Sequence, residues 1–154
     1  MKRTNNFVKV DNASDRKDYM ELLKKIKKEN VCPFCMDYFL KNNPTPILRN
    51  TKHWITTTNI SPYIGTKLHF LFVYKKHIEF AGALPAEASA ELMKLVGWLT
   101  KKYNMPAGGF FMRYGDGAYN GSSVAHLHAQ LILGSKKGAD TFAIAPTLGF
   151  GKKK

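Results

Sequence analysis

The segment VAHLHAQLIL, residues 124–133, carries polar side chains at every second position. Side chains alternate between two faces along a β-strand, so a strand here would project His126, His128 and Gln130 from one face. Imidazole is both a nucleophile toward phosphorus and a good leaving group near neutral pH, so this stripe would suit covalent catalysis. The same alternation is typical of a half-buried antiparallel strand, and the segment alone does not distinguish the two interpretations.

A second chemical motif is the C-x-x-C formed by Cys32 and Cys35, the only two cysteines of the chain. One interpretation is a redox dithiol, because CPFC resembles the active-site motif of glutaredoxins. That motif should lie between a strand and a helix, whereas here we expect a basic helix before it and a turn after it. Another interpretation is half of a Cys₂His₂ zinc site, and a third is an unliganded pair. The histidines that could complete a zinc site are His53, His69, His77, His126 and His128.

Length and composition predict one globular domain over residues 1–154, with flexible ends at residues 1–15 and 149–154. The chain is 44% hydrophobic, which excludes a disordered protein. No apolar run approaches the roughly 20 residues of a membrane-spanning helix, and the first residues lack the apolar core of a secretory signal. We therefore expect a cytoplasmic protein that does not bind membranes.

The net charge is strongly positive, with 24 Lys and Arg against 11 Asp and Glu, formally +13. Much of the excess lies in RKDYMELLKKIKKEN, residues 16–30, and in the final GKKK. Such a surface attracts polyanions, among them nucleotides with several phosphates and nucleic acids. A basic surface that only confers solubility is the other interpretation.

Hydrophobic periodicity predicts two helices and five strands. The helices are expected over residues 16–30, an amphipathic segment, and over residues 84–104, where Leu92, Leu95, Val96 and Leu99 form one stripe. The strands are expected at residues 47–50, 53–58, 68–76, 108–115 and 124–133. This order predicts an α+β fold with an antiparallel sheet.

Three segments together resemble the histidine triad (HIT) superfamily of nucleotide hydrolases and transferases. They are NISPYIGTKLHFLFVYKKHI (59–78), NGSSVAHLHAQLIL (120–133) and CPFC (32–35), the last being similar to a zinc-binding variant of the family. The resemblance spans residues 32–133, 102 of 154 residues. It implies a HIT-like fold with an antiparallel sheet of about five strands and packed helices. It also implies a nucleotide substrate and a two-fold homodimer.

The resemblance also implies roles for single residues. His128 matches the family's nucleophile, and Ser123 resembles its phosphate-contacting serine. Gly121 and Ser122 would bring backbone N–H groups to the phosphate, as glycine-containing loops do. Asn59 and Ile60 match the positions that bind ribose and base, although the family carries an acidic residue where Asn59 stands.

The zinc-bearing relatives imply the metal-ligand set Cys32, Cys35, His77 and His126, holding a structural Zn²⁺. For His77, a solvated histidine after two lysines is the alternative. A second departure from the family is Gly115, where relatives often carry a phosphate-contacting asparagine; Arg113 or Asn120 would compensate. His53 and His69 are interpreted as structural strand residues.

Gln130 occupies the third position of the triad, where hydrolases carry histidine. The pattern His-x-His-x-Gln resembles the transferase branch, and glutamine stays uncharged but donates through its amide. We therefore predict nucleotidyl transfer through a nucleotidyl-histidine, with Gln130 and Ser123 assisting His128. The favoured reaction is phosphorolysis of dinucleoside polyphosphates such as diadenosine tetraphosphate. The alternatives are hydrolysis of dinucleoside polyphosphates or nucleoside phosphoramidates, action on adenylylated nucleic-acid ends, and nucleotide binding without catalysis.

Overall fold

The computed structural model describes residues 6–154. The first half of this range contains η1 (Val10–Ala13), α1 (Lys17–Glu29), α2 (Met36–Asn42), β1 (Ile47–Asn50), β2 (Trp54–Thr58) and β3 (Leu68–Tyr74). The second half contains η2 (Ala81–Ala83), α3 (Ala86–Lys102), β4 (Gly109–Arg113), α4 (Gly117–Asn120) and β5 (His128–Leu133).

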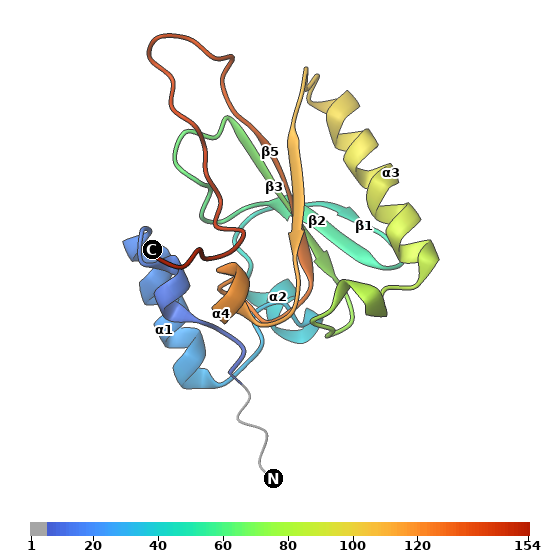
Figure 1. The fold of residues 1–154 in the computed structure, drawn as a ribbon. Coiled ribbons are helices and arrows are strands. Elements are labelled where there is room, and N and C mark those ends of the chain that lie inside the picture. Colours follow the sequence, from blue (N-terminus) through green and yellow to red (C-terminus); the bar gives the residue numbers. More distant parts are fainter. Residues whose placement is uncertain (1–5) are drawn as a thin grey trace.

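Within residues 6–154 the strands form one five-stranded sheet in the order β1-β2-β3-β5-β4 (Figure 1). Each neighbouring pair is antiparallel. The last strand in the sequence, β5, is therefore inserted between β3 and β4 and is paired on both sides. The α+β fold with an antiparallel sheet, predicted from the sequence, is confirmed.

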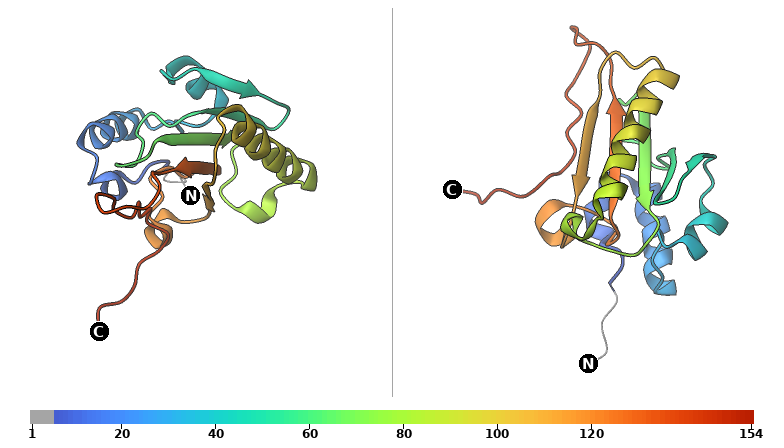
Figure 2. Two further views of the ribbon diagram at one scale, coloured as in Figure 1. Left: turned by 90° about the horizontal axis from the view of Figure 1, so that it is seen from above. Right: turned by 90° about the vertical axis from the view of Figure 1, so that its right-hand side faces the viewer.

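One face of the sheet packs against α3 (Figure 2). Phe70, Phe72 and Tyr74 of β3 project to this side and meet the stripe of α3. Burying a side chain of this size stabilises the fold by roughly 1.5–3 kcal/mol, so these contacts make this layer the main core. The helix begins after Pro85, whose fixed φ suits the residue preceding a helix, and it has Lys101 and Lys102 in its last turn.

The opposite face of the sheet carries the intervening residues and is covered by the N-terminal elements. Leu71 and Val73 of β3 pack with Phe39 of α2. Leu23 and Ile26 of α1 pack in a separate cluster with the segment around residue 124. The space between the sheet and α1 is where the chemically active side chains gather.

Two local expectations are wrong. A helix, α2, follows CPFC where a turn was expected; it has only seven residues and is held by the buried Phe39. The strand expected from residue 124 begins instead at His128, because Val124 pairs with Val8 and the Leu127 N–H donates to the Ile78 carbonyl. His126 therefore lies just before the strand.

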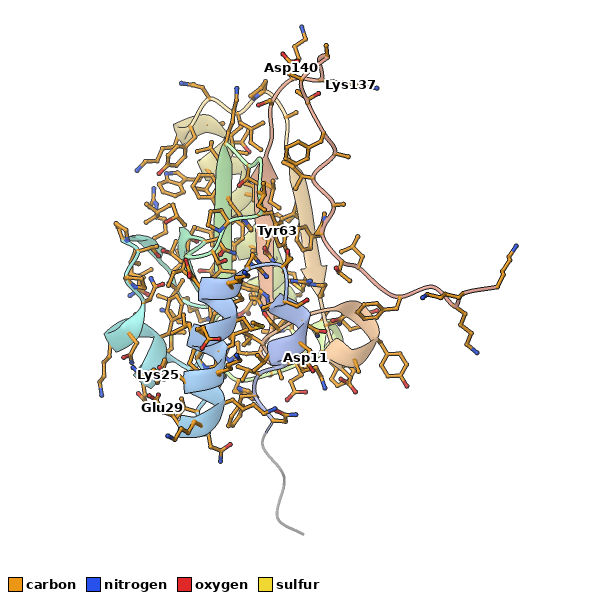
Figure 3. The ribbon with its side chains drawn as sticks, turned by 90° about the vertical axis from the view of Figure 1, so that its left-hand side faces the viewer. Asp11, Lys25, Glu29, Tyr63, Lys137 and Asp140 are labelled. Atoms are coloured by element: carbon orange, nitrogen blue, oxygen red, sulfur yellow. The ribbon has the colours of Figure 1, made fainter. Side chains whose placement is uncertain are left out.

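The terminal segments differ in their packing. Residues 1–5 of the segment expected to be flexible lie outside the described residues, whereas Val8 and Ala13 are buried. After β5 the chain turns back near Lys137 and Asp140 and runs down beside the sheet without regular structure (Figure 3). Residues 149–154 are exposed. No helix within residues 6–154 is both long and apolar enough to cross a membrane.

Candidate functional site

The centre of the candidate site is the face of the sheet that α1 and α2 cover. In the antiparallel register His128 lies opposite Val73 on one side and Arg113 on the other. Gln130 lies opposite Leu71. Directly opposed residues project to the same face with Cβ atoms roughly 4.5–5.5 Å apart, so Arg113 is an immediate neighbour of His128.

His128 is held in one tautomer by its own chain. Its Nδ1–H donates to the carbonyl oxygen of His126 at 2.7 Å. Because a carbonyl only accepts, Nε2 keeps its lone pair. Burial lowers the pKa of His128 to about 4, and the nearby Arg113 charge acts in the same direction. At neutral pH the ring is therefore uncharged, and its Nε2 lone pair is not used by the His126 carbonyl.

His69 lies in β3, as expected for a strand residue, and it is also in contact with Gln130. Its Nδ1 accepts the Tyr63 backbone N–H at 3.2 Å, so Nε2 carries the proton and donates to Gln130 Oε1 at 2.6 Å. This bond fixes the amide of Gln130 and leaves its NH₂ group as a donor. The alternation of side chains along the strand carries a signal for this position. Within LHFLFVY, His69 lies on the same face as Leu71 and Val73, which pair directly with Gln130 and His128.

A cavity, here called the first cavity, opens beside these residues. His128, Gln130, Ser123 and Asn59 contribute its polar groups. Its apolar wall comes from the N-terminal elements and the loop after β2, including Tyr19, Leu22, Leu23, Ile26, Phe34, Phe39 and Ile60. A cavity with an apolar wall and with these polar groups, together with those of Arg16, Arg113, Asn42 and Asn43, suits a nucleoside that carries a phosphate.

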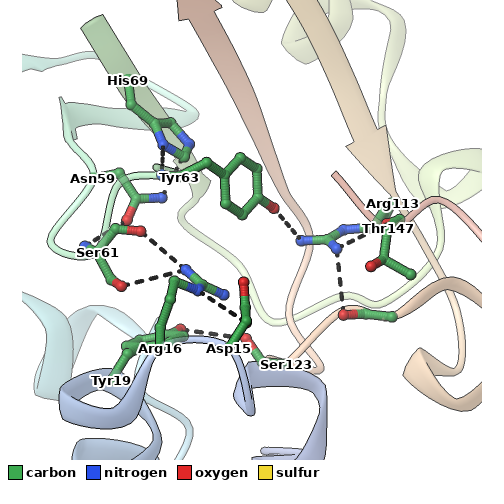
Figure 4. Close-up of polar contacts among 11 residues, drawn as sticks. Asp15, Arg16, Tyr19, Asn59, Ser61, Tyr63, His69, Arg113, Ser123 and Thr147 are labelled. Atoms are coloured by element: carbon green, nitrogen blue, oxygen red, sulfur yellow. Dashed lines mark hydrogen bonds and ion pairs between the residues drawn. The ribbon is translucent and has the colours of Figure 1, made fainter. Parts of the chain in front are cut away.

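The structure places Asn59 and Ile60 on the rim of the first cavity, as a base and ribose site requires. Asn59 Oδ1 accepts the backbone N–H of Ser61 at 2.8 Å, and its amide nitrogen lies 3.2 Å from His69 Nε2 (Figure 4). Ile60 remains 42% exposed, so its side chain is available to a flat ligand.

The loop before the histidines differs from expectation. The Gly121 N–H donates to the Gly117 carbonyl, and the Ser122 N–H donates to Asn120 Oδ1 at 2.8 Å. The expectation that these two N–H groups bind phosphate is therefore wrong for this structure, because the turn of α4 already uses them. Ser123 does line the first cavity, where its Oγ lies 3.3 Å from the Tyr19 hydroxyl.

Of the two candidates to compensate for Gly115, only Arg113 faces His128. The Asn120 side chain is used within its own turn, where its amide donates to the Tyr114 carbonyl at 2.8 Å. Arg113 lines the first cavity and donates to the Tyr63 hydroxyl at 3.3 Å.

The four residues Cys32, Cys35, His77 and His126 converge although they come from three separate segments. Their ligand atoms all lie within 4.8 Å of one another. Cys32 Sγ is 3.3 Å from His126 Nδ1, Cys35 Sγ is 3.4 Å from His77 Nδ1, and the two Nδ1 atoms are 3.2 Å apart. Ligands of tetrahedral zinc, bonded at about 2.0–2.3 Å, are separated by roughly 3.3–3.8 Å, so the cluster has the size of a metal site.

The surroundings of this cluster orient its ligands. His126 Nε2–H donates to the Tyr74 carbonyl at 2.6 Å, which directs Nδ1 toward the cysteines. Burial lowers the pKa of His126 to about 4, so its ring is neutral and able to bind a cation. The cysteines are not joined in a disulfide, and they lie between α1 and α2 rather than between a strand and a helix. The geometry favours the metal interpretation over the redox one.

His126 links the group of possible metal ligands to His128. His126 supplies Nδ1 to the cluster, while its carbonyl oxygen fixes His128. Phe34, which lies between the two cysteines in the sequence, packs edge-on against the His128 ring at a centroid distance of 5.0 Å. An ion bound at the cluster would therefore hold the wall of the first cavity in place.

The buried histidines predict a specific acid sensitivity. The pKa values of His69 and His128 fall from 6.5 to about 4 on folding, because burial disfavours the charged ring. Between these values only the unfolded chain binds the protons, so the unfolding free energy should fall as the pH is lowered from 6.5 toward 4. Denaturant unfolding across this interval measures the slope. His69→Gln removes one of three such groups, since the pKa of His126 is lowered to the same value, and should reduce the slope; an unchanged slope would contradict the assignment.

Comparison with known proteins establishes the fold. No protein-family model matches the sequence, and no curated protein sequence matches it. Among solved structures, a HIT family hydrolase from Clostridium thermocellum aligns with a TM-score of 0.57 at 22% identity, over 72% of this chain and 96% of that one. A HIT family member from Bacillus subtilis aligns with a TM-score of 0.55 at 24% identity, over 75% and 82%. A histidine triad nucleotide-binding protein from Candida albicans aligns with a TM-score of 0.54 at 22% identity, over 73% and 87%. The chain therefore has the fold of the histidine triad proteins.

Proposed function

We propose that this chain, which has the histidine triad fold, transfers a nucleotidyl group through a covalent bond to His128. The observation that carries the proposal is the state of that ring. It is neutral, its Nδ1–H is bound to a carbonyl of its own chain, and it lines the first cavity together with Ser123 and Gln130. A buried imidazole with no catalytic task would not need to border an open cavity.

The first step forms one bond and breaks one. The lone pair of His128 Nε2 attacks the α-phosphorus, an N–P bond forms, and the P–O bond to the leaving group breaks. The departing oxygen leaves with the bonding electron pair. The NH₂ group of Gln130 stabilises the negative charge that grows on the phosphoryl oxygens, and Arg113, opposite His128 in the register, stabilises the charge on the departing phosphate.

In the second step an acceptor attacks the same phosphorus, and Nε2 leaves with the electrons of the N–P bond. We propose inorganic phosphate as the acceptor and a dinucleoside polyphosphate as the donor. Diadenosine tetraphosphate would then yield ATP in the first step and ADP in the second. Gln130 supports this choice because it offers no ionisable group to activate water, and both ring nitrogens of its neighbour His69 are already engaged in hydrogen bonds. Hydrolysis, with water as acceptor, is the alternative.

Product analysis separates these reactions. We expect diadenosine tetraphosphate to give equimolar ATP and ADP, with a rate that depends on added phosphate. Chromatography of the products with and without phosphate is the measurement. AMP in place of ADP would mean that water is the acceptor and that the reaction is hydrolysis, not phosphorolysis. No conversion of dinucleoside polyphosphates or of adenosine phosphoramidate would favour a binding module.

We further propose that Cys32, Cys35, His77 and His126 hold a structural Zn²⁺. The donor set supports zinc, since two thiolates and two imidazoles are a common structural combination. Four protein ligands leave no coordination position for water or substrate. The ion would supply rigidity, and the reaction would remain with the residues of the first cavity.

A homodimer is the oligomeric state that we propose, joined through the free edge of β4. This strand ends the sheet, and its Phe110 is 39% exposed. An unpaired edge offers backbone donors and acceptors to a second copy. Sedimentation of the purified protein tests this.

Nucleic acid is a second candidate substrate, favoured by one observation. The exposed side of α1 carries Lys17, Lys24, Lys25, Lys27 and Lys28, and residues 152–154 are exposed lysines. Such a surface would bind backbone phosphates next to an adenylylated end. Binding that weakens steeply with salt would support this alternative.

A further inference from the structure

A second cavity adjoins the first one, and three residues line both: Arg16, Tyr63 and Arg113. Its remaining wall comes from residues 11–15, from Ile64, from the loop at Gly121 and from the C-terminal segment between Phe142 and Phe150. None of the sequence motifs lies in this segment. The second cavity is separated from His128 only by the residues that it shares with the first cavity, so a ligand bound at His128 could extend into it.

The two arginines face each other across Tyr63. The Arg16 guanidinium carbon lies 5.2 Å from the Tyr63 ring centroid, and Arg113 Nη2 donates to the Tyr63 hydroxyl at 3.3 Å. Figure 4 shows Tyr63 between the two guanidinium groups, with its hydroxyl turned toward Arg113. We call Arg16 and Arg113 the arginine pair.

Both members of the arginine pair retain unused hydrogen-bonding capacity. The Nε atoms of Arg16 and Arg113 are buried and have no hydrogen-bond partner within residues 6–154. A carboxylate oxygen of Asp15 lies 3.6 Å from Arg16 Nε, too far for a hydrogen bond, and Asp15 is exposed to water. Buried donors without partners are costly, so an anionic ligand that accepts from them would be stabilised.

The positive charge of the arginine pair acts on His128 and on its neighbour His69. Arg113 lies opposite His128 in the register, and both arginines act on His69 by lowering its pKa. Two acidic residues, Asp11 and Asp15, also line the second cavity, but both are exposed and therefore screened. Arg113 thus provides positive charge next to His128, and Arg16 adds to it at the border of the two cavities.

The C-terminal segment is built into the site at defined points. Arg113 Nη1 donates to the Thr147 carbonyl at 3.0 Å. A Cβ atom at Gly121 would lie 2.5 Å from Thr147, and one at Gly65 would lie 2.7 Å from Phe142. Both glycines have positive φ, so the loops give the segment close approach where other residues would clash.

From these contacts we propose that the arginine pair binds the phosphates of the leaving group, and that the second cavity receives the remainder of it. The ligand class is a nucleoside polyphosphate that departs when His128 attacks the α-phosphorus. This deepens the proposed function and rests on it. The nucleotidyl group would occupy the first cavity, and the phosphate chain would cross between Arg16 and Arg113.

Equilibrium binding tests the arginine pair independently of turnover. ATP and AMP are titrated into the native protein and into Arg16→Gln and Arg113→Gln, with Arg49→Gln as the control. Arg49 stacks on Trp98 of α3, away from both cavities. We expect ATP to bind more tightly than AMP, and the ratio of their dissociation constants to fall about 10-fold or more in either variant, because each loses a charge-assisted contact to the distal phosphates. The control should keep the ratio.

Equal effects of either substitution on ATP and AMP, or no preference for ATP in the native protein, would overturn the proposal. Thermal unfolding of each variant identifies one that fails to fold, and the second arginine then provides the independent test. Since binding needs no catalysis, failure of the proposed function and failure of the arginine pair are distinguishable.

Filling the second cavity provides a steric test. Ala145 lines it and is exposed, so Ala145→Trp should block the cavity without disturbing the core. The matched control is Ala139→Trp, because Ala139 lies shortly before this segment, is exposed and does not line the cavity. We expect Ala145→Trp to raise KM for diadenosine tetraphosphate about 10-fold while leaving adenosine phosphoramidate, whose leaving group is ammonia, unaffected. Equal loss with both substrates would place the leaving group elsewhere.

Discussion

Replacing His128 with alanine is expected to lower turnover of a dinucleoside polyphosphate by about 10⁴-fold or more, because no other group replaces a missing covalent nucleophile. The side chains next to His128 cannot take its place as the nucleophile. Ser123 and Gln130 are uncharged donors, and His69 already donates its Nε2–H to Gln130. The measurement is the initial rate with diadenosine tetraphosphate and phosphate.

The covalent step has its own readout. A substrate labelled at the α-phosphorus should leave an acid-labile, base-stable adduct on the native protein and none on His128→Ala. His53→Ala is the matched control, because the His53 ring bonds to Glu91 at 2.5 Å, outside the first cavity. Circular dichroism checks that the His128 variant folds. If a folded His128→Ala kept activity within 10-fold of the native enzyme, the covalent mechanism would be wrong.

Removing the metal is expected to have the largest effect on stability. Zinc ligation would join the loop between α1 and α2 to His77, in the loop after β3, and to His126, two residues before β5. These segments are far apart in the sequence. Loss of a structural ion that links such segments costs several kcal/mol, which should lower the melting temperature by more than about 10 °C. Thermal unfolding with and without a strong chelator measures this, and elemental analysis should find about one zinc per chain.

Substitutions refine the metal test. Cys35→Ser and His77→Asn each remove one ligand and should lose zinc, whereas His53→Asn should retain it. Activity should fall together with zinc in the first two variants, because the His126 carbonyl that fixes His128 belongs to a ligand residue. A native protein that is free of zinc, or that melts at the same temperature in chelator, would refute the metal assignment.

Much of the framework was readable from local patterns. The stripe of Leu92, Leu95 and Leu99 predicted α3, and all three side chains are buried against the sheet. The near-continuous apolar run at residues 68–74 predicted β3, which proves to be a central strand buried on both faces. Amphipathic and apolar periodicities persist because packing rewards the same spacing that the sequence shows.

Short elements were not readable in this way. The helix α2 has seven residues, too few for periodicity to show, and it forms because Phe39 reaches the core. The start of β5 shifted from residue 124 to His128 because Val124 pairs with Val8, more than a hundred residues earlier in the chain. Such contacts between distant segments leave no trace in a local window.

Some residues of the candidate site were selected from the sequence, and others were found only in the structure. Side-chain type and spacing drew attention to His126, His128, Gln130 and the two cysteines, whereas the roles of His128 as nucleophile and of His77 and His126 as metal ligands came from the resemblance to the histidine triad proteins. His69, Arg16 and the segment from Phe142 to Phe150 were not selected, since nothing in their immediate neighbours distinguishes them from ordinary strand, helix or tail residues. Folding alone brings them to this part of the sheet: His69 lies on β3 beside β5, Arg16 lines both cavities, and the segment from Phe142 to Phe150 lines the second one. Chemical capacity is a property of single side chains, whereas their convergence depends on pairing between segments far apart in the chain.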